Sequence, residues 1–487
     1  MRLAHDVATI RAAEATLKAS LPPGTLMDRA AAGLTATCAG LLRKVYGAQV
    51  VVLAGSGDNG GDALFAGAML ARRGAVVTAL LLGSRAHIGG LAALRSAGGR
   101  VADASALATA DLVIDGIVGI GGSGGLHESA AAAVREIAAA ATVVAVDVPS
   151  GVDADTGVVE GVAVRAHVTV TFGTWKPGLL VDPGAQYAGA TELVDIGLAP
   201  HLPTASVTAL QPGDVAHLLP APTAESDKYR RGVVGVVAGS KTYTGAALLA
   251  TGGALRAGAG MVRFVSVAHP AELVRARWPE AVVTELKGTP DDDVLAAGRV
   301  QAWVVGPGIG TDAYAEQLVA QVLSADVPVV VDADALTVLA RNPSLVSRRR
   351  APTIVTPHAG ELTRLLGLDP SARAEVEARR LEYARAAVDL LRVTVLLKGS
   401  TTVICAPNGM VRLNPTGTSW LATAGSGDVL SGITGALLAG GLNALDAASC
   451  AAYVHGAAGR AAAQGAPIVA EDIIASLATA MRSRSET

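Results

Sequence analysis

Short apolar runs of strand length recur along this chain, and most of them end in a loop rich in glycine or acidic residues. Residues 50–54 form one such run. A glycine-rich loop follows it, then a helical stretch from 61 to 73 and a second strand from 76 to 82. This β-loop-α-β order builds parallel sheets that carry helices on both faces. The sequence therefore predicts an α/β protein.

The pattern continues through all 487 residues, a length that suits roughly two to four domains. In the first half, further strands are expected at residues 112–114, 143–146 and 168–171. In the second half, a helix is expected at 245–257 and strands at 233–238, 302–305, 329–331, 353–355 and 393–397. Asn408-Gly409 predicts a β-hairpin. Because the stretch 200–229 is polar and proline-rich, we expect domains at residues 1–207 and 208–487.

Composition excludes several classes of protein. Charged residues make up 17% of the chain and apolar residues 51%, as in packed globular proteins. The net charge of −3 implies no basic face, so nucleic acid is not an expected partner. Cys38, Cys405 and Cys450 are far apart and lack metal-ligand spacing, which favours a reducing cytoplasm. Charges near the N-terminus argue against a signal peptide, and glycines interrupt residues 429–445, so no membrane partner is expected.

One motif of the second half points to chemistry. Ala424-Gly-Ser-Gly-Asp428 joins a glycine-rich loop, a carboxylate and the start of an apolar helix. Free backbone N–H groups at a helix N-terminus favour an anion, and glycines allow the backbone to approach it. Asp428 could then accept the proton of a hydroxyl group that attacks a phosphoryl group. The same residues would also suit an Asp N-cap on a core helix.

The first half has a comparable loop, Gly55-Ser-Gly-Asp-Asn-Gly-Gly-Asp62. It has neither the dinucleotide GxGxxG spacing nor the Gly-Lys-Ser/Thr of a P-loop. Its glycines could admit a phosphate, and Asn59 and Asp62 offer oxygens for a cation or for ribose hydroxyls. Asp115 and Asp147 follow two later strands. Because ligands bind beyond the carboxyl ends of strands in open parallel sheets, we expect these loops to converge, although each residue alone would suit a turn or a cap.

Five motifs of the first half occur in a recognisable order: Leu26-Met-Asp-Arg-Ala30, Asp58-Asn-Gly-Gly-Asp62, Asp115, Val146-Asp-Val-Pro-Ser-Gly151 and Phe172-Gly-Thr-Trp-Lys-Pro-Gly178. They resemble the epimerase domain of NAD(P)H-hydrate repair proteins, which implies a Rossmann-like three-layer domain. The resemblance implies that hydrated NADH or NADPH is bound by Asp58, Asn59, Gly60, Gly61, Asp62, Gly119, Ile120, Gly121, Gly122, Ser123, Gly124, Gly125 and Asp147. It also implies a potassium ion held by Asn59, Asp115 and Ser150.

The second half carries six further motifs: residues 252–260, 305–310, 331–335, 356–361, 397–399 and 424–432. They resemble the ADP/ATP-dependent NAD(P)H-hydrate dehydratase, which implies a ribokinase-like fold. The resemblance implies that the hydrate is bound by Ala254, Gly308, His358 and Asp428, with Asp428 as the base. It implies that ADP or ATP, with Mg²⁺, is bound by Lys398, Gly399, Ser400, Thr401, Thr402 and Gly427.

Some positions depart from the family pattern. Asp58 and Ala63 replace the more frequent Asn and Gly, and Ala359 stands where Pro is usual. The segment 116–125 lacks the bulky or basic residues of some relatives, which leaves the proton-transfer residues of the epimerase open.

The resemblance covers nearly the whole chain in the family's order. It implies a bifunctional enzyme: an epimerase for the C6 epimers of hydrated NAD(P)H, and a nucleotide-dependent dehydratase that returns the S epimer to NAD(P)H. The expected partners are these small molecules, and a homo-oligomer is expected. The alternative is a ribokinase-fold small-molecule kinase with a ligand-sensing N-terminal domain.

Overall fold

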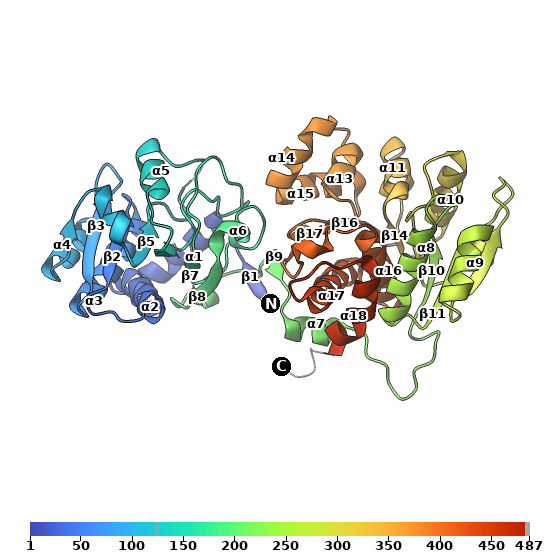
Figure 1. The fold of residues 1–487 in the computed structure, drawn as a ribbon, viewed down its shortest axis with the longest axis horizontal. Helices are drawn as coiled ribbons and strands as arrows, with labels where there is room; N and C mark the ends of the chain where they lie inside the picture. The colour runs from blue at the N-terminus through green and yellow to red at the C-terminus, as the bar shows by residue number, and fades with distance from the viewer. Residues whose placement is uncertain (123, 483–487) are drawn as a thin grey trace. The chain divides into compact units, whose positions relative to one another are not determined.

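The computed structural model describes residues 1–122 and 124–482 (Figure 1). The chain divides into two compact units. One consists of Leu3–Val207, and the other begins at Thr208 and also includes Met1–Arg2. Each unit is an α/β structure with its own hydrophobic core. Among the helices of the described residues, none is long and apolar enough to cross a membrane.

The N-terminal unit alternates helices and strands. Its elements, with short 3-10 helices marked η, are α1 (Val7–Ala19), α2 (Thr25–Leu41), β2 (Gln49–Ala54), α3 (Asp58–Arg72), β3 (Val76–Leu81), α4 (Ile88–Ser96), β4 (Arg100–Val101), η1 (Ala104–Thr109), β5 (Leu112–Gly116), α5 (Glu128–Arg135), β6 (Thr142–Val146), β7 (Val168–Phe172), η2 (Pro177–Leu179), α6 (Ala185–Ala188), β8 (Ala190–Val194) and η3 (Ala199–His201).

These strands form a parallel seven-stranded sheet in the order β4-β3-β2-β5-β6-β7-β8. Successive side chains of a strand point to opposite faces, and each face of β2 joins a different core. Val50 and Val52 pack with α1 to α4, whereas Val51 and Leu53 pack with α5. The result is a Rossmann-like three-layer domain. The strand order reverses between β2 and β5, which makes this point the topological switch of the sheet.

The C-terminal unit has a larger set of elements. They are β1 (Arg2–Ala4), β9 (Val207–Ala209), α7 (Pro212–Leu218), β10 (Val233–Val237), α8 (Thr244–Arg256), β11 (Met261–Val267), α9 (Ala268–Arg277), β12 (Val282–Leu286), η4 (Leu295–Ala297), β13 (Ala302–Val305), α10 (Ala313–Ser324), β14 (Val329–Val331), α11 (Asp334–Arg341), α12 (Ser344–Ser347), β15 (Thr353–Val355), α13 (Ala359–Leu365), η5 (Pro370–Ala372), α14 (Arg373–Ala378), α15 (Arg380–Leu391), β16 (Thr394–Leu397), β17 (Thr402–Cys405), β18 (Val411–Asn414), η6 (Ser419–Leu421), α16 (Ser426–Ala439), α17 (Ala444–Ala463) and α18 (Ala470–Arg482).

The sheet of this unit has the order β1-β9-β18-β17-β16-β15-β14-β13-β10-β11-β12. Strands β10 to β16 are parallel, and β17 and β18 form an antiparallel hairpin. Helix α16 contacts β10, β13 and β14, and α8, α17 and α18 pack around it. The strand order reverses between β10 and β13, so this sheet also has a switch point.

The predicted fold class is confirmed, and so is the hairpin across Asn408-Gly409. Two local expectations were wrong. Helix α3 begins at Asp58 rather than at residue 61, because Gly57 serves as its N-cap. Asp115 lies within β5 and does not follow the strand. The proline-rich stretch, where the domain boundary was expected, also contains β9 and α7, and a capping box of Gln211 and Asp214 starts α7.

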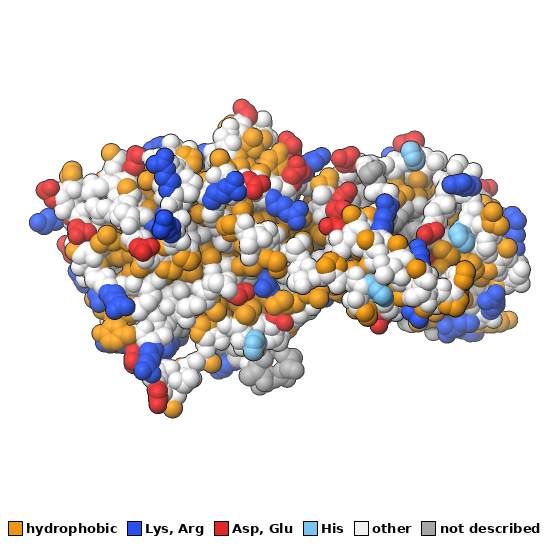
Figure 2. Space-filling view, turned by 180° about the vertical axis from the view of Figure 1, so that it is seen from behind, with side chains coloured by type: hydrophobic (Ala, Val, Ile, Leu, Met, Phe, Trp, Pro, Cys, Tyr) orange, Lys and Arg blue, Asp and Glu red, His pale blue; other side chains and the backbone are white. Residues whose placement is uncertain are grey.

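The surface agrees with the small net charge. On the face drawn in Figure 2, Lys and Arg side chains are interspersed with Asp and Glu side chains.

Candidate functional sites

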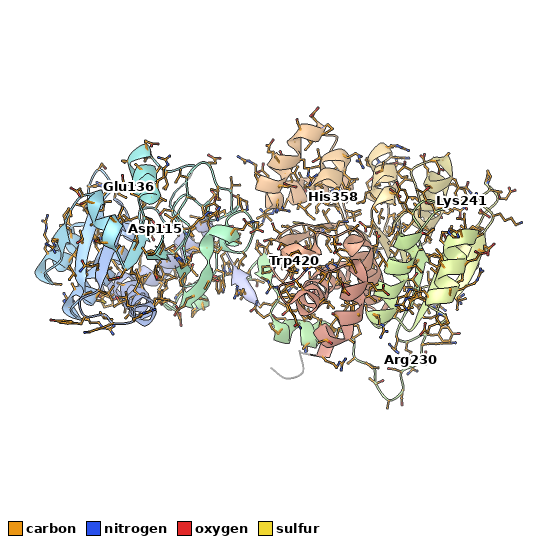
Figure 3. The ribbon with its side chains drawn as sticks, in the orientation of Figure 1. Asp115, Glu136, Arg230, Lys241, His358 and Trp420 are labelled. Atoms are coloured by element: carbon orange, nitrogen blue, oxygen red, sulfur yellow. The ribbon has the colours of Figure 1, made fainter. Side chains whose placement is uncertain are left out.

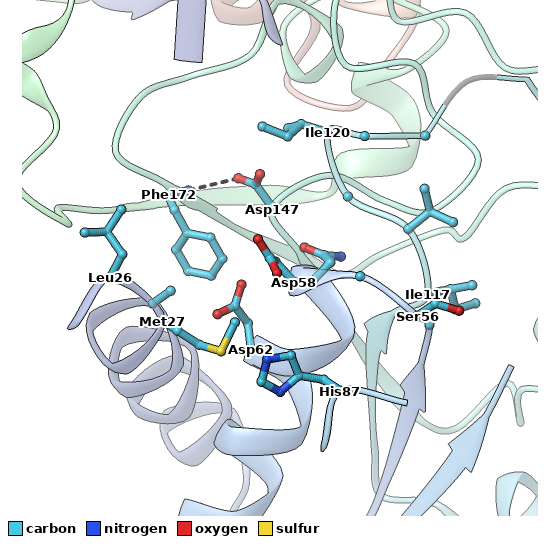
Figure 4. Close-up of a pocket in the computed structure, with 18 of the residues that line it drawn as sticks. Leu26, Met27, Ser56, Asp58, Asp62, His87, Ile117, Ile120, Asp147 and Phe172 are labelled. Atoms are coloured by element: carbon cyan, nitrogen blue, oxygen red, sulfur yellow. Dashed lines mark hydrogen bonds between the residues drawn. The ribbon is translucent and has the colours of Figure 1, made fainter. Parts of the chain in front are cut away.

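The main cavity of the N-terminal unit lies at its switch point and has a volume of about 1320 Å³. The loops after β2, β5 and β6 line it, as the sequence predicted for convergent strand ends (Figure 4). The predicted hydrate-binding residues on its wall are Asp58, Asn59, Asp62, Gly119, Ile120, Gly121, Gly122, Gly124, Gly125 and Asp147.

Gly60 and Gly61, which also belong to this predicted set, are not on the wall. A Cβ on Gly60 would lie 2.3 Å from the carbonyl oxygen of Gly55, and a Cβ on Gly61 would lie 2.9 Å from the ring of His87. Both glycines therefore allow the start of α3 to pack closely against neighbouring loops. Asp115 and Ser150 lie beneath the cavity in the core, and Ser123 is outside the described residues.

Asp147 ends β6 in a strained turn. Its φ is +66°, and the N–H of Val148 donates to the carbonyl of Val146 at 2.8 Å, which closes a three-residue turn. Such a φ is uncommon for a residue other than glycine and is often found at functional sites. Asp147 Oδ1 accepts hydrogen bonds from Thr171 Oγ1 and from the N–H of Phe172, both at 3.1 Å.

Lys176 is the ion-pair partner of Asp147. Its Nζ forms an ion pair with Asp147 Oδ1, and it also donates to Thr171 Oγ1 at 2.9 Å and to the carbonyl of Phe172 at 3.0 Å. Lys176 is only 1% exposed, so its ammonium group depends on these three acceptors. Lys176 lies within the sequence motif Phe172-Gly-Thr-Trp-Lys-Pro-Gly178, but no role was predicted for it. The sequence did contain a signal for this ion pair. Lys176 comes shortly after β7, the strand that pairs with β6, and Asp147 follows β6.

Asp62 is the other buried carboxyl of this cavity. It lies in the first turns of α3 and is 9% exposed, and its Oδ1 is buried without a hydrogen-bond partner among the described residues. Burial raises the pKa of Asp62 well above its usual range, and the nearby carboxylates of Asp147, Asp58 and Glu14 raise it further. The cavity thus combines an ion-paired carboxylate with a carboxyl that favours its protonated form.

Asp115, labelled in Figure 3, forms a buried oxygen cluster with Ser150 beneath the loop after β5. Ser150 donates to Asp115 through its Oγ at 2.6 Å and through its N–H at 2.8 Å, and its Oγ lies 3.0 Å from the carbonyl oxygen of Val118. Burial raises the pKa of Asp115 to about 6, and no cationic side chain of the described residues pairs with it.

These donors fit a potassium ion in part. One carboxylate, one hydroxyl and backbone carbonyls suit a hard monovalent ion, and a cation would balance the unpaired charge of Asp115. Asn59 is nearby in the fold, since its Nδ2 donates to the carbonyl of Val146 at 3.0 Å and its Oδ1 would lie 2.7 Å from a Cβ on Gly119.

In the C-terminal unit, a cavity of about 180 Å³ lies at the switch point. Its walls come from the segments after β10, β13 and β14 and from α16, in the form of Tyr243, Ala246, Gly308, Asp334 and Asp428. Gly308 has a φ of +65°, and a Cβ there would lie 2.8 Å from Tyr243 Cβ. Only glycine lets this turn approach the loop after β10.

Asp428 lies in the first turn of α16, two residues after the N-terminal Ser426, so it is not the N-cap. Gly425 is the N-cap at a φ of +81°. Burial raises the pKa of Asp428 to about 7; the carboxylate of Asp332 also raises it, and the ammonium group of Lys398 lowers it. A carboxyl whose pKa is near neutrality is suited to accept a proton and release it again.

Lys398 extends from the end of β16 and is 20% exposed. Its Nζ lies 2.7 Å from Asp332 Oδ1 and 3.7 Å from Glu361 Oε2, and a Cβ on Gly427 would lie 3.4 Å from it. Ser431 Oγ donates to Asp332 Oδ2. Lys398 therefore connects the end of β16 to the first turn of α16.

His358 is the N-cap of α13 (Figure 3). Its ring Nδ1 accepts a hydrogen bond from the backbone N–H of Glu361 at 3.1 Å. The backbone N–H of His358 in turn donates to Glu361 Oε2 at 2.8 Å. Partial burial lowers the pKa of His358, and the ammonium group of Lys398 lowers it further.

The structure brings together Lys398, Gly427 and Asp428, but not the whole predicted set. Ala254 is fully buried in the core, where α8 packs against α16. The rest of the predicted nucleotide-binding run forms the turn between β16 and β17, with Gly399 and Ser400 exposed, Thr401 buried and Thr402 opening β17.

Sequence reasoning gave no role to Asp332, Asp334 and Glu361, although the quoted motifs contain them. Their positions carried a signal: two acidic residues directly follow the apolar strand β14, and Glu361 stands three residues after His358, as in a capping box.

Two α/β units, each with carboxylates at the switch point of a parallel sheet, are the arrangement expected of an enzyme with a ligand site in each unit. Family models agree: the NAD(P)H-hydrate dehydratase family matches residues 234–478, and the YjeF-related protein N-terminus matches residues 23–178. The bifunctional NAD(P)H-hydrate repair enzyme of Mycobacterium leprae is 50% identical over 465 residues, which covers 93% of each chain. That of Mycobacterium tuberculosis is 51% identical and covers 92% of each.

A solved structure supports the C-terminal fold. The ADP/ATP-dependent NAD(P)H-hydrate dehydratase of Bacillus subtilis, co-crystallised with ATP and Mg²⁺, is 31% identical with a TM-score of 0.52. The match covers 57% of this chain and 99% of that one. A ribokinase-like superfamily protein of Enterococcus faecalis is 25% identical with a TM-score of 0.51. The chain belongs to the family of bifunctional NAD(P)H-hydrate repair enzymes.

Proposed function

We propose that this chain repairs hydrated NADH and NADPH through two activities, epimerisation in residues 1–207 and ADP- or ATP-dependent dehydration in residues 208–487. Family membership over nearly the whole chain supports both, and it favours repair over a small-molecule kinase. The structural observation that carries the dehydratase assignment is Asp428, a carboxyl with a pKa of about 7 on the wall of a cavity and next to Lys398.

Hydration of the nicotinamide ring explains why two activities belong together. Water adds across the 5,6 double bond and gives two epimers at C6. A stereospecific dehydratase consumes only the S epimer, so an epimerase must return the other to the usable pool. Because hydroxide is a poor leaving group, phosphorylation of the C6 hydroxyl allows the ring nitrogen's lone pair to expel phosphate and restore the double bond.

In the C-terminal unit, Asp428 takes the proton of the C6 hydroxyl as that oxygen attacks the terminal phosphoryl group of the nucleotide. The nucleotide is held by Lys398, by the turn that runs to Thr402 and by Gly427. The ammonium group of Lys398 balances the charge of the phosphates. Gly308 and His358 position the hydrate, whereas Ala254 contributes through the packing of α8 against α16 in the core. The carboxylates of Asp334 and Asp428 line the cavity and are oxygen donors of the kind that Mg²⁺ prefers, so Mg²⁺ accompanying the nucleotide fits this site.

In the N-terminal unit, the cavity at the switch point holds the hydrate, with Asp58 to Asp62, the loop Gly119 to Gly125 and Asp147 around it. Asn59, Asp115 and Ser150 hold potassium, which balances the charge of Asp115. We propose cytoplasmic function, since Cys38, Cys405 and Cys450 are buried thiols that form no disulfide within the described residues.

The test is to incubate purified protein with both hydrate epimers and either ADP or ATP, and to follow phosphate and dihydronicotinamide absorbance. Repair predicts that one phosphate is released for each dihydronicotinamide restored. Accumulation of a phosphorylated product without restored absorbance would support the kinase alternative instead.

A further inference from the structure

Asp62 has an environment that no binding role explains. Its carboxyl group projects into the cavity of the N-terminal unit, beside Met27 and His87 (Figure 4). The residue is 9% exposed, and Oδ1 is buried with no hydrogen-bond partner in the described part of the chain. An ionised oxygen without a partner is costly in such a place, whereas a carboxylic acid is tolerated.

The neighbouring charges favour the same protonated state. Asp147 approaches from the end of β6, Asp58 lies one turn earlier on α3, and Glu14 lies on α1. Lys18, also on α1, opposes them, but burial and the three carboxylates prevail, so the pKa of Asp62 is well above its usual range.

Asp147 has the opposite environment on the same cavity. Its Oδ1 forms an ion pair with Lys176 and accepts a hydrogen bond from the N–H of Phe172. Two carboxyl groups in such different surroundings, one ion-paired and the other buried with an oxygen that has no partner among the described residues, are a recurrent basis for an acid paired with an anionic stabiliser.

We propose that Asp62 is the general acid of the epimerase site and donates its proton to the C6 hydroxyl of the hydrate. This inference rests on the proposed epimerase function. As the proton reaches the C6 oxygen, the C6–O bond breaks and water leaves. The lone pair of N1 forms an N1=C6 double bond, and Asp147 stabilises the resulting iminium cation.

The reverse step restores the enzyme. Water adds to the opposite face of C6, and the N1=C6 electron pair returns to N1. The proton that the added water loses returns to the Asp62 carboxylate through water in the cavity. The other epimer is formed with no net change in atoms, protons or electrons.

The test is the full-length chain with Asp62→Asn, which keeps the shape of the side chain but cannot supply the proton. Epimer interconversion, corrected for the spontaneous rate, should fall about 100-fold or more, the contribution of a general acid. Binding of the hydrate should stay within about tenfold, and dehydration of the S epimer should be unchanged. Asp28→Asn is the matched control, since Asp28 lies on the same cavity wall but is exposed. It should keep the parental rate.

The unsubstituted protein gives a second, independent readout. Its epimerisation kcat should fall as pH rises above the pKa of Asp62, because only the acid form donates, and Asp62→Asn should abolish this dependence. Parental kcat in Asp62→Asn, or a flat pH profile of the parent, would overturn the role of Asp62 while leaving the epimerase function intact. A parent chain that does not accelerate interconversion at all would overturn the proposed function itself.

Discussion

The two units place their sites at the same point of similar sheets, yet the sites differ in size. Each lies where the strand order reverses, after β2 and β5 in one unit and after β10 and β13 in the other. The N-terminal cavity has a volume of about 1320 Å³, and the C-terminal cavity about 180 Å³. The parallel sheet thus fixes where a ligand binds, while the loops fix what is bound.

The two sites also share a charge arrangement. Lys176 pairs with Asp147 in the first and Lys398 pairs with Asp332 in the second, and each leaves another carboxyl with a raised pKa nearby. They differ in access, because Lys176 is 1% exposed and Lys398 is 20% exposed. A fully buried lysine can only support its aspartate, whereas Lys398 can also meet a nucleotide phosphate.

The largest expected effect separates the two sites. Asp428→Asn should reduce nucleotide-dependent dehydration at least about 1000-fold, since the proton acceptor is lost, while nucleotide binding stays within about tenfold. Epimerisation by the same variant should be normal. Measuring both rates on one preparation makes the N-terminal unit the internal control. Near-parental dehydration would remove Asp428 from the mechanism.

A smaller effect is expected where the lysine acts on a neighbouring carboxyl. Lys398 lowers the pKa of Asp428. Lys398→Met should therefore raise that pKa above about 7 and move the dehydration pH profile to higher pH, with a loss of about 10- to 100-fold at pH 7. The nucleotide KM should rise as well. Lys287→Met, at an exposed lysine, is the control. An unshifted profile in Lys398→Met would contradict this coupling.

Asp115→Ala tests the cation of the N-terminal site. Epimerisation should fall about tenfold and lose its response to potassium, because no carboxylate remains to hold the ion, while dehydration of the S epimer should hardly change. The comparison is between potassium and a bulky organic cation at equal ionic strength. If the parent and Asp115→Ala respond equally to potassium, the ion is bound elsewhere or does not contribute.

The smallest effect concerns stability. The carboxyl of Asp428 has a pKa of about 7 in the folded protein and an ordinary value of 3.8, so the folded state binds this proton more tightly. The free energy of unfolding of the C-terminal unit should therefore fall as pH rises from about 4 to 7. Asp428→Asn removes this penalty and should stabilise the unit by about 1–3 kcal/mol at pH 8, and by little at pH 4. Urea unfolding followed by the fluorescence of buried Trp303 measures the difference in unfolding free energy between Asp428→Asn and the parent. If this difference is the same at pH 4 and pH 8, the raised pKa is contradicted.

Much of this comparison could be predicted from the sequence. Apolar runs such as residues 50–54 gave the strands, because buried parallel strands need continuous apolar residues. Asp62, Asp147 and Asp428 were identified because each stands near the carboxyl end of a strand or the start of a helix. The exact ends of the helices were harder to predict. Helix α3 begins at Asp58, because Gly57 is its N-cap and because Gly60 has no side chain to clash with the loop before it.

The partners of these residues could not be predicted, since they depend on contacts between distant segments. Lys176 and Asp147 are 29 residues apart, and Lys398 and Asp332 are 66 apart. The core position of Ala254 also depends on a contact between distant segments. Glycines in α8 and α16 allow these two helices to pack closely, which buries Ala254 between them. A Cβ on Gly432 would lie 2.1 Å from the carbonyl oxygen of Ala250.

The central claim is that each unit performs its own reaction. The direct test compares the full chain with a fragment of residues 208–487, given both epimers and a nucleotide, while each epimer is quantified over time. The account predicts that the full chain consumes both epimers, whereas the fragment consumes the S epimer rapidly and the other only at the spontaneous interconversion rate. Equal consumption of both epimers by the fragment, faster than spontaneous interconversion, would contradict the division of labour.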